Sequence, residues 1–466
     1  MIKDENFIHK GALFPPTEEL ERLNRYSDNK DIFSGKHCKL YQEELKRIDR
    51  VIGQYDMNIT YPVLLNYQKL VSVKTADMLL SEQPVVTTLK PTNIDKIIED
   101  SDFWSTIYEA TIDVSRYGQG ILCVSKDDNG TYLSLSQPKN WYPICNSENL
   151  KDVTAHVIAW IEKDDKGKGF VVQQIHHKGY YLLNRFKVSL DGYSKRGQVT
   201  VGEMVSSERY ATDVEDFAII VLSNVTSSDS IYGKDDYADI NSLIIESMVR
   251  LGQISKILDM HASPSMTGSD NLVQSDPVTG GYYFKVSNFY PSVDGVKTEY
   301  ITWDGKLDSA FREFELLTEQ LYILSEMSKT IFDSESSGVS SGTALKFKLL
   351  SPMYKVSRLA KLFSVPLKRV IKALLDDKTI LLSDIKLVFK DGLPNDETEI
   401  ANIINSRVKE TTLSRKTALM TYDEMTEEEA NAEVDRIKGD TEKQDSMGFS
   451  LNSEKSEGLE GPFKPF

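Results

Sequence analysis

The spacing of apolar and polar residues divides the chain into helical and strand-forming stretches. Apolar residues recur at three- and four-residue steps over residues 61–80, 94–117, 235–261 and 306–332. This spacing predicts amphipathic helices, with one or two of them in the second stretch. From about residue 121 to residue 223, apolar and polar residues alternate in short runs separated by turn signals such as DDNG, KGKG and LDGY. The alternation predicts a mostly antiparallel β section.

Two long predicted helices bracket a small insertion. Each of them covers about 25 residues, or roughly 38 Å at 1.5 Å per residue. The segment between them, residues 263–306, is rich in Ser, Pro, Gly and Asp and holds two strand-like runs, GGYYFKV and EYITW. The chain therefore predicts the order helix, small β-containing insertion, helix.

A loop of Ser and Gly, SESSGVSSG at 334–342, follows the second long helix and leads into a basic helical segment. Pro352 and Pro366 each remove an i→i−4 hydrogen bond, so both are expected to kink that helix. No acidic residue occurs from Ser336 to Leu375. The basic residues of this stretch are Lys346, Lys348, Lys355, Arg358, Lys361, Lys368, Arg369 and Lys372.

The rest of the chain is acidic enough that the formal net charge is still −16. A length of 466 residues exceeds a single hydrophobic core, so about three domains are expected. The cysteines Cys38, Cys123 and Cys145 are few and scattered, which indicates free thiols in a reducing compartment. The first residues lack the apolar stretch of a signal peptide, and no run approaches 18 apolar residues, so no membrane span is expected.

The C-terminal third continues with smaller elements. IKLVF at 385–389 predicts a lone strand, and residues 396–437 predict acidic helices. The polar, Gly- and Ser-containing tail from residue 438 is expected to be disordered.

Several short motifs suggest catalysis, but their context argues against it. Residues 338–342 match G-x-S-x-G, yet a nucleophile elbow needs a strand before its Ser, and here a helix precedes. His176 and His177 are adjacent in a predicted strand, so their side chains point to opposite faces and do not readily share one metal. No G-x-x-x-x-G-K-[ST] occurs, so any ATP-driven motor has to be a partner. Asp235 and Asp236 are interpreted as a helix N-terminus rather than a metal site.

Short motifs in a fixed order give the chain a family resemblance. They are NYQKLVSVKTADMLL (66–80), RYGQGILCVS (116–125), SQPKNWYPI (136–144), YGKDDYADINSLI (232–244), SGTALKFKLL (341–350), FKDGLPNDETEIA (389–401) and LSRKTAL (413–419). Together they resemble the portal protein of tailed bacteriophages, in the branch found in long-tailed phages of Gram-positive bacteria. Two departures are SEQP at 81–84, in place of a Tyr-Leu-Phe-Gly-type segment, and Asp235, in place of the usual Ser.

The resemblance implies an α+β, portal-type subunit with a mixed α/β wing, two long stem helices, a small α/β clip insertion and a helical C-terminal crown. The implied boundaries are wing 1–234, stem helix 235–262, clip 263–306, second stem helix 307–332, tunnel loop 333–342, further wing 343–395, crown 396–437 and a disordered tail 438–466.

The resemblance also implies a function without enzymatic activity, cofactor or metal. Twelve subunits would form a ring at one capsid vertex of the virion, through which double-stranded DNA passes during packaging and ejection. The implied partners are the terminase large subunit, a head-completion or adaptor protein, and the major capsid and scaffold proteins, with no membrane. Assembly would take place in the host cytoplasm.

Three groups of site residues follow from the resemblance and from residue chemistry. The DNA-channel tunnel loop would contain Ser334, Ser336, Ser337, Gly338, Val339, Ser340, Ser341 and Gly342. Lys346 and Lys348 would contact DNA phosphates. The clip would use aromatic residues to contact neighbouring subunits or partners, namely Tyr282, Tyr283, Phe284, Phe289, Tyr290 and Trp303.

Physical arguments fit a DNA conduit and leave alternatives open. An acidic channel wall repels a duplex from all sides and so favours sliding over binding. The Ser/Gly loop is equally compatible with an ordinary connection. The basic helix is compatible with DNA contact, with a neighbouring subunit or with a solvated face. For the whole protein, the alternatives are a ring or capsid component without DNA contact and a serine hydrolase or nuclease.

Overall fold

The computed structural model describes residues 2–50, 63–127, 130–146, 148–189, 197–212, 214–262, 265–269, 274–275, 282–283, 288–292, 299–301, 307–332, 346–390, 397–422, 425 and 429–439. The chain divides into two compact units. The first contains residues 1–339 and 346–392, and the second contains residues 340–345 and 393–466.

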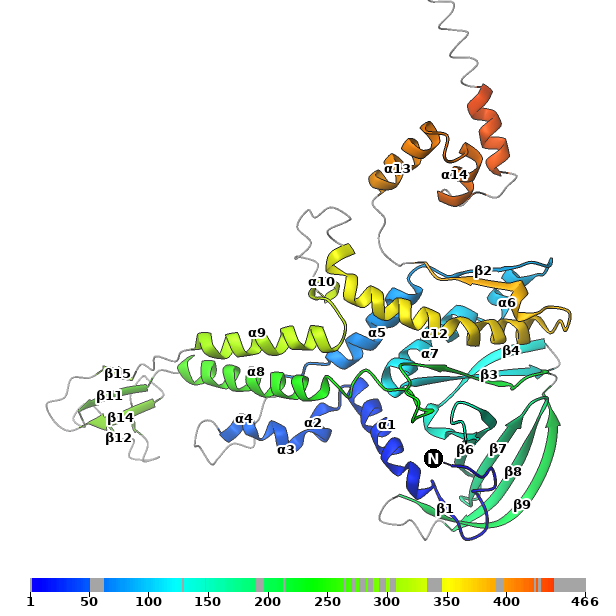
Figure 1. The fold of residues 1–466 in the computed structure, drawn as a ribbon. Helices are drawn as coiled ribbons and strands as arrows, with labels where there is room; N and C mark the ends of the chain where they lie inside the picture. Colours follow the sequence, from blue (N-terminus) through cyan, green and yellow to red (C-terminus); the bar gives the residue numbers. More distant parts are fainter. Residues whose placement is uncertain are drawn as a thin grey trace, which may run out of the picture. The chain divides into compact units, whose positions relative to one another are not determined.

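The N-terminal part of the first unit is helical (Figure 1). A short strand β1 (Leu13–Phe14) and a 3₁₀ turn η1 (Thr17–Glu19) precede α1 (Leu20–Phe33). Next come α2 (His37–Leu40), α3 (Gln42–Leu45), α4 (Arg47–Arg50) and α5 (Tyr67–Leu80). The Asn66 side chain caps α5 by accepting a hydrogen bond from the Lys69 backbone N–H.

The β section predicted from alternation forms two antiparallel sheets. The larger sheet has the order β1-β9-β8-β7-β6-β5, and the smaller one has the order β10-β3-β4. The strands of the larger sheet are β5 (Trp141–Cys145), β6 (Val153–Lys163), β7 (Gly169–His177), β8 (Tyr180–Ser189) and β9 (Val199–Ala211). Those of the smaller are β3 (Gln119–Asp127), β4 (Gly130–Ser136) and β10 (Ile219–Ser223), with η2 (Pro138–Asn140) between β4 and β5.

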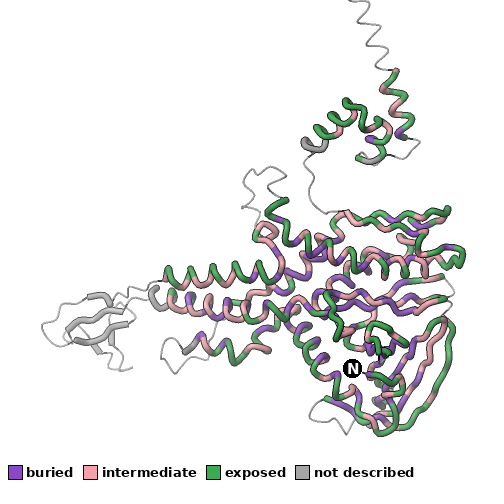
Figure 2. The backbone as a smooth tube through the Cα atoms, viewed as in Figure 1, coloured by how far each residue is buried: buried purple, intermediate pink, exposed green. Residues whose placement is uncertain are grey.

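The segment 94–117 forms two helices, α6 (Ile94–Asp100) and α7 (Phe103–Tyr117). Apolar side chains of α7 and of the later helix α12 (Leu350–Leu375) pack in one core against the smaller sheet. Ile107 of α7 and Phe363 and Leu367 of α12 are fully buried there. Figure 2 shows the buried positions as stripes along the helices, as their apolar periodicity predicts.

The two long helices predicted around the insertion are α8 (Asn241–Ala262) and α9 (Leu307–Leu324), which pack side by side (Figure 1). The prediction of one helix through Phe332 was wrong. Helix α9 ends at Leu324, and a short helix α10 (Lys329–Phe332) follows. The chain turns at Glu326, whose φ is +57°, and the Met327 N–H bonds to the Tyr322 carbonyl at 3.0 Å. This left-handed cap satisfies the last carbonyls of the helix.

The insertion contains short strands whose pairing is defined. Strand β11 (Ser265–Ser269) pairs in parallel with β14 (Asn288–Ser292) and antiparallel with β15 (Glu299–Ile301). Strand β12 (Gln274–Ser275) pairs with β13 (Tyr282–Tyr283). The β character predicted for this insertion is therefore confirmed.

Two further expectations were wrong. Pro352 does not interrupt α12, because it lies in the first turn, where the helix needs no amide hydrogen; Pro366 alone is inside the helix. The strand over 385–389 is not alone. After the 3₁₀ turn η6 (Leu382–Asp384), β16 (Ile385–Val388) pairs antiparallel with β2 (Val85–Thr88), about 300 residues earlier.

The second unit is helical where it is described, as its sequence predicts. It contains α13 (Glu397–Lys409), α14 (Arg415–Tyr422) and a helix over 429–439. Residues 438 and 439 belong to that helix, and the rest of the tail predicted to be disordered lies outside the described residues. Among the residues described in both units, no helix has the length and apolar character needed to cross a bilayer.

Candidate functional site

The predicted tunnel loop, from Ser334 to Gly342, lies outside the described residues, as does the G-x-S-x-G match within it. The elements that flank it are described. Helix α10 ends at Phe332 before the loop, and residues 346–348 lead from it into α12. Lys346 and Lys348 are both exposed at this point. The structure thus places the two predicted phosphate contacts on the surface immediately after the loop.

The aromatic residues predicted to make contacts lie partly on the strands of the insertion. Tyr282 and Tyr283 form β13, and Phe289 and Tyr290 belong to β14. Phe284 and Trp303 are outside the described residues. The backbone of Phe289 is paired with Met266 and that of Tyr290 with Thr267.

A buried ion pair joins three helices where the loop-flanking elements meet. Lys355 of α12 is only 2% exposed, and its Nζ lies 2.9 Å from Asp236 Oδ2. The same ammonium donates a hydrogen bond to the Ser325 carbonyl, 3.3 Å away, at the end of α9. Because Asp236 lies in the turn that leads into α8, one side chain of α12 contacts the ends of both long helices.

The Asp236 carboxylate is held by further hydrogen bonds. Ser115 Oγ donates to its Oδ2 at 2.7 Å, and Asn224 Nδ2 donates to its Oδ1 at 3.0 Å. The Ser72 hydroxyl lies 2.9 Å from both Ser115 Oγ and the Tyr237 hydroxyl, which extends the network to α5. A buried charge is tolerated only when it is paired and hydrogen-bonded in this way.

The neighbouring Asp235 organises the backbone of the same turn. Its Oδ1 accepts hydrogen bonds from the backbone N–H groups of Tyr237 (3.2 Å) and Ala238 (3.0 Å). Arg25 Nε lies 3.3 Å from Asp235 Oδ2. Burial raises the pKa of Asp235 above its ordinary value, and the nearby Arg25 charge opposes that rise. The predicted helix start at this acidic pair was wrong, because α8 begins only at Asn241. Asp235 instead holds the preceding turn through the Tyr237 and Ala238 amides, and Asp236 is used in the ion pair.

A second ion pair lies one turn further along α12. Arg358 donates to both carboxylate oxygens of Glu326, with Nη1 3.1 Å from Oε1. This hydrogen bonding raises the pKa of the Arg358 guanidinium. Because Glu326 forms the left-handed turn after α9, Lys355 and Arg358 together fix the end of α9 against α12.

These contacts line a cavity of about 260 Å³. Its walls include Asn224, Lys234, Asp239, Ser325 and Arg358. Two pairs of its charged groups, Lys355 with Asp236 and Arg358 with Glu326, are the ion pairs described above. The two ion pairs and the Lys355–Ser325 hydrogen bond hold the end of α9 and the turn before α8 against α12.

A close approach of two glycines supports the same junction. A Cβ on Gly118, whose φ is +86°, would lie 2.1 Å from the Gly233 carbonyl oxygen. The Gly118 carbonyl accepts a hydrogen bond from the Asn224 N–H at 2.8 Å. Only glycine fits this backbone position, which brings the end of α7 against the segment leading to Asp236.

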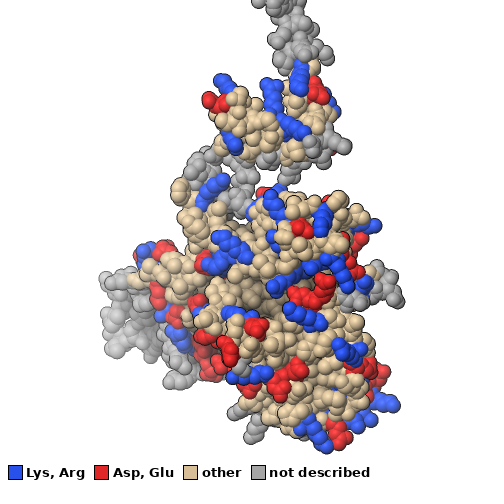
Figure 3. Space-filling model, turned by 45° about the vertical axis from the view of Figure 1, so that its right-hand side comes forward, with Lys and Arg blue, Asp and Glu red and all other residues tan. Residues whose placement is uncertain are grey.

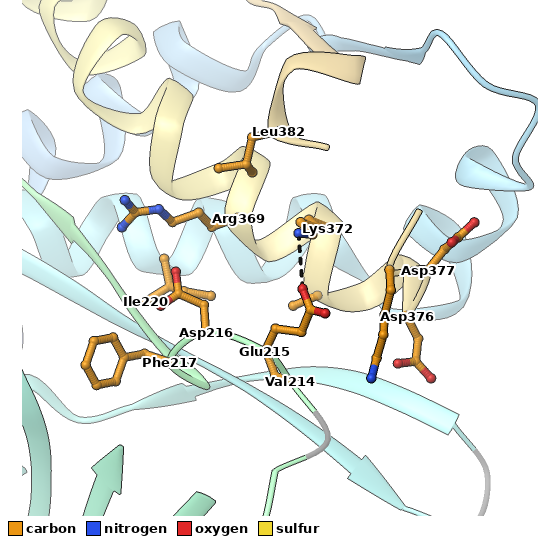
Figure 4. Close-up of a pocket in the computed structure, with 12 residues that line it drawn as sticks. Val214, Glu215, Asp216, Phe217, Ile220, Arg369, Lys372, Asp376, Asp377 and Leu382 are labelled. Carbon is orange, nitrogen blue, oxygen red and sulfur yellow. Dashed lines mark hydrogen bonds and ion pairs between the residues drawn. The ribbon is translucent and has the colours of Figure 1, made fainter. Parts of the chain in front are cut away.

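A small hollow lies between the C-terminal half of α12 and the segment that leads into β10 (Figure 4). Its volume is about 100 Å³. Lys372 extends across it toward Glu215, with 3.5 Å between Nζ and Oε2. Arg369 and Asp376 also line it, and Asp376 pairs with Lys126 at 2.6 Å. Much of the charge around this hollow is thus balanced within the chain.

The structure separates the basic residues of α12 into two groups. Lys355, Arg358 and Lys372 pair with acidic residues of the same chain, a role that sequence reasoning missed. The burial of Lys355 could have been predicted from the sequence, because Leu359 and Phe363 follow it by four and eight residues and lie on the same buried face of the helix. Lys361 and Arg369 lie on the exposed side of the helix.

The described residues support no metal site. Among them, no group of three or more His, Cys, Asp or Glu side chains is arranged to hold an ion. His176 is buried and stacks on Tyr181, whereas His177 Nε2 lies 3.4 Å from Glu5 Oε2. The two histidines therefore have separate surroundings, as expected for neighbours on a strand.

Comparison with known families places this architecture among the phage portal proteins. The family model described as "Phage portal protein, SPP1 Gp6-like" matches residues 16–447. The chain therefore belongs to the SPP1 Gp6-like portal family, and it is a head–tail connector subunit of the virion. The family resemblance predicted from the sequence motifs is confirmed.

Other comparisons are distant. The neck of a native GTA particle computed with C12 symmetry contains a chain with 12% identity and a TM-score of 0.39, covering 76% of this chain and 87% of that one. The neck of an empty GTA particle computed with C6 symmetry gives 11% identity, a TM-score of 0.40 and the same coverage. No curated protein matches the sequence.

Proposed function

We propose that copies of this subunit form a closed ring, twelve in number as the portal resemblance implies, around a channel that carries double-stranded DNA during packaging and ejection. The observation that carries the proposal is the family match over residues 16–447. The order of elements supports it, since two long packed helices enclose an insertion and a further long helix, α12, follows them in the chain.

In this proposal the parts of the chain have separate roles. Residues 1–234 and 343–395 form the wing, 235–262 and 307–332 the stem, 263–306 the clip, and 396–437 the crown. The loop 333–342 narrows the channel, and Lys346 and Lys348 lie within reach of DNA phosphates. The favoured role of the aromatic residues of the clip is contact with a neighbouring subunit. The second role is contact with the terminase large subunit or the adaptor protein.

The junction of α8, α9 and α12 explains how such a loop can be supported. Lys355 and Arg358 fix α12 to the end of α9, and the loop connects α10, which follows α9, to α12. Both flanks of the loop are thereby anchored in one network.

The acidic balance of the chain fits a conduit. A net charge of −16 per subunit makes non-specific DNA binding weak, because binding depends on cations that neutralise phosphates. The exposed Lys346 and Lys348 are local exceptions. They would guide the duplex at one level of the channel without retaining it.

The first experiment is electron microscopy of the purified protein together with its mass in solution. We expect rings with a central hole and about twelvefold symmetry. A subunit that stays monomeric at high concentration and in the presence of scaffold protein would contradict the ring. The partners and the assembly in the host cytoplasm are tested by co-purification of terminase, adaptor and scaffold from infected cells.

The second experiment concerns the loop. Shortening Ser334–Gly342 is expected to leave rings intact and to reduce DNA packaging, and DNA-filled heads at normal yield would contradict the tunnel-loop assignment. Charge reversal at Lys346 and Lys348 is compared with reversal at Lys96, which is exposed on α6. We expect a packaging defect only from the first pair.

A further inference from the structure

The exposed side of α12 carries a row of apolar and cationic side chains. Phe347 is 72% exposed and Tyr354 is 64% exposed, although both are large and aromatic. Residues at three-, four- and seven-residue steps lie along one side of a helix, so the groups from Leu350 to Val365 form a line along α12, and Phe347 lies just before its start. We define the α12 stripe as Phe347, Leu350, Tyr354, Lys361, Leu362 and Val365.

The α12 stripe has no anionic partner of its own. No acidic residue occurs from residue 346 to residue 375. Lys361 makes no ion pair with any side chain in the part of the chain that the structure describes, in contrast to Lys355 on the buried side. The opposite side of the helix is packed against the core through Leu359 and Phe363. Arg358, four residues after Tyr354 on the same side, is already paired with Glu326. The stripe itself faces outward.

A second surface has the complementary composition. The outer side of α9 exposes Leu316 and Ile323, and Ile323 is 64% exposed. Acidic residues lie among them, and Asp308 and Glu319 form no ion pair within the described ranges. The other side of α9 packs on α8, with Leu321 buried. Glu315 on this side is already paired with the exposed Arg312, at 3.1 Å. We define the α9 face as Asp308, Leu316, Glu319 and Ile323.

DNA is a poor occupant for the α12 stripe. Phosphates are recognised by cations and hydrogen-bond donors, and duplex DNA offers no apolar surface against which the five large apolar side chains of the stripe could be buried. A surface of apolar and cationic groups instead fits a protein surface of apolar and anionic groups. The α9 face is such a surface. Figure 3 shows one face of the molecule, on which basic and acidic side chains both lie among uncharged ones.

We propose that the α12 stripe of one copy docks on the α9 face of a second copy. Because the two surfaces differ, the contact is head-to-tail and can repeat from subunit to subunit until a ring closes. This inference rests on the proposed ring and names the surfaces that build it. Large apolar side chains at the centre and a Lys–Glu pair beside them match the usual anatomy of a stable interface.

The test uses two variants that each lack one surface. Variant one carries Tyr354→Ser, Lys361→Glu and Val365→Ser on the α12 stripe. Variant two carries Leu316→Ser, Glu319→Lys and Ile323→Ser on the α9 face. A matched control carries Met204→Ser and Val205→Ser, which are as exposed on β9 (54% and 51%). Analytical ultracentrifugation measures the mass of each protein alone and in equal mixtures.

Wild type and control are expected to form rings, and each variant alone is expected to self-associate at least about 100-fold more weakly. Mixing the variants is expected to give a one-to-one pair, because each supplies the surface that the other lacks. Such pairing also shows that both variants are folded. If a triple variant does not fold by circular dichroism, Tyr354→Ser and Ile323→Ser alone are used in the same mixture.

The outcomes separate this inference from the ring itself. Rings that form normally from variant one overturn the inference, and a loss of salt-dependent DNA binding in those rings would assign the stripe to DNA. A mixture of folded variants that yields no pair while wild type forms rings also overturns it. Wild type that never forms rings contradicts the proposed function instead.

Discussion

Lys355 Nζ of α12 lies 2.9 Å from Asp236 Oδ2, and this buried ion pair joins the helix after the loop to the turn that starts α8. The ammonium also reaches the Ser325 carbonyl at the end of α9. A single side chain therefore links α12, the turn before α8 and the end of α9. Its burial means that solvent and salt screen the pair only weakly.

Replacing Lys355 with Met is expected to destabilise the subunit by about 3–5 kcal/mol, because Asp236 is left as a buried charge without its cation. Chemical denaturation of the monomer measures the change. The matched control is Lys96→Met on the exposed surface of α6, which is expected to change stability by less than about 0.5 kcal/mol. Adding Asp236→Asn to Lys355→Met is expected to recover part of the loss. A Lys355→Met variant as stable as the control would contradict this role.

Gly118 and Gly11 allow the cost of a left-handed backbone to be separated from the cost of a steric clash with a neighbouring group. Both have φ +86°, but a Cβ on Gly118 meets the Gly233 carbonyl oxygen at 2.1 Å, whereas a Cβ on Gly11 has nothing within 4 Å. Gly11→Ala is expected to cost about 1–2 kcal/mol, the price of the left-handed backbone alone. Gly118→Ala is expected to cost about 3 kcal/mol or more, since overpacking is added. Thermal unfolding of the two variants measures their stabilities. Equal losses of stability in Gly118→Ala and Gly11→Ala would refute the close approach of Gly118 and Gly233.

Asp113 is predicted to make stability fall as the pH rises. Burial raises its pKa from 3.8 to about 6, against the effect of Arg116. Between about pH 4 and pH 6 the folded state therefore holds a proton that the unfolded state has already released. The resulting contribution to the free energy of unfolding is complete below about pH 4 and is lost as the pH rises through about 6. Asp113→Asn is expected to stabilise the protein by about 1–2 kcal/mol at pH 7.5 and to have little such effect below pH 4. Unfolding is compared with Asp100→Asn, an exposed control on α6. A pH-independent difference would rule the prediction out.

His156 is predicted to have the opposite pH dependence. Burial lowers its pKa from 6.5 to about 3, and its Nδ1 accepts a hydrogen bond from Trp141 Nε1 at 3.1 Å. Below pH 6.5 the imidazole is protonated in the unfolded state, whereas in the folded state it stays neutral down to about pH 3. The free energy of unfolding therefore falls as the pH falls through this range.

When the pH is lowered from 8 to 5, the free energy of unfolding of the wild type is expected to fall by about 2 kcal/mol more than that of His156→Gln. The measurement is the free energy of unfolding at each pH. His9→Gln, an exposed change near the N-terminus, is expected to follow the wild type. Parallel pH profiles for wild type and His156→Gln would show that His156 is not the titrating group.

Local patterns predicted most of the elements. The alternating stretch forms β strands, and the three- and four-residue steps form α5, α7, α8 and α9. The end of α9 was missed because its left-handed cap is Glu326, and neither Gly nor Pro marks the turn. The pairing of β16 with β2 was missed because register between distant strands leaves no trace in either segment alone.

The candidate site was predicted only in part. The sequence singled out the acidic pair but placed it at a helix start, whereas α8 begins at Asn241 and Asp235 holds the turn before it. The basic helix was treated as one surface, whereas Lys355 and Arg358 pair with carboxylates of the same chain and Lys361 remains exposed. Charge alone does not reveal this division, because it depends on which acidic groups other segments bring near.

The sequence by itself determined the family, the order of helices and strands, and the acidic balance, because motifs, periodicity and charge are properties of neighbouring residues. The tertiary structure decided where α9 turns, which strand β16 joins, and that Lys355 is buried against Asp236. Those outcomes depend on the desolvation and packing of groups far apart in the chain, which are fixed only when the whole subunit folds.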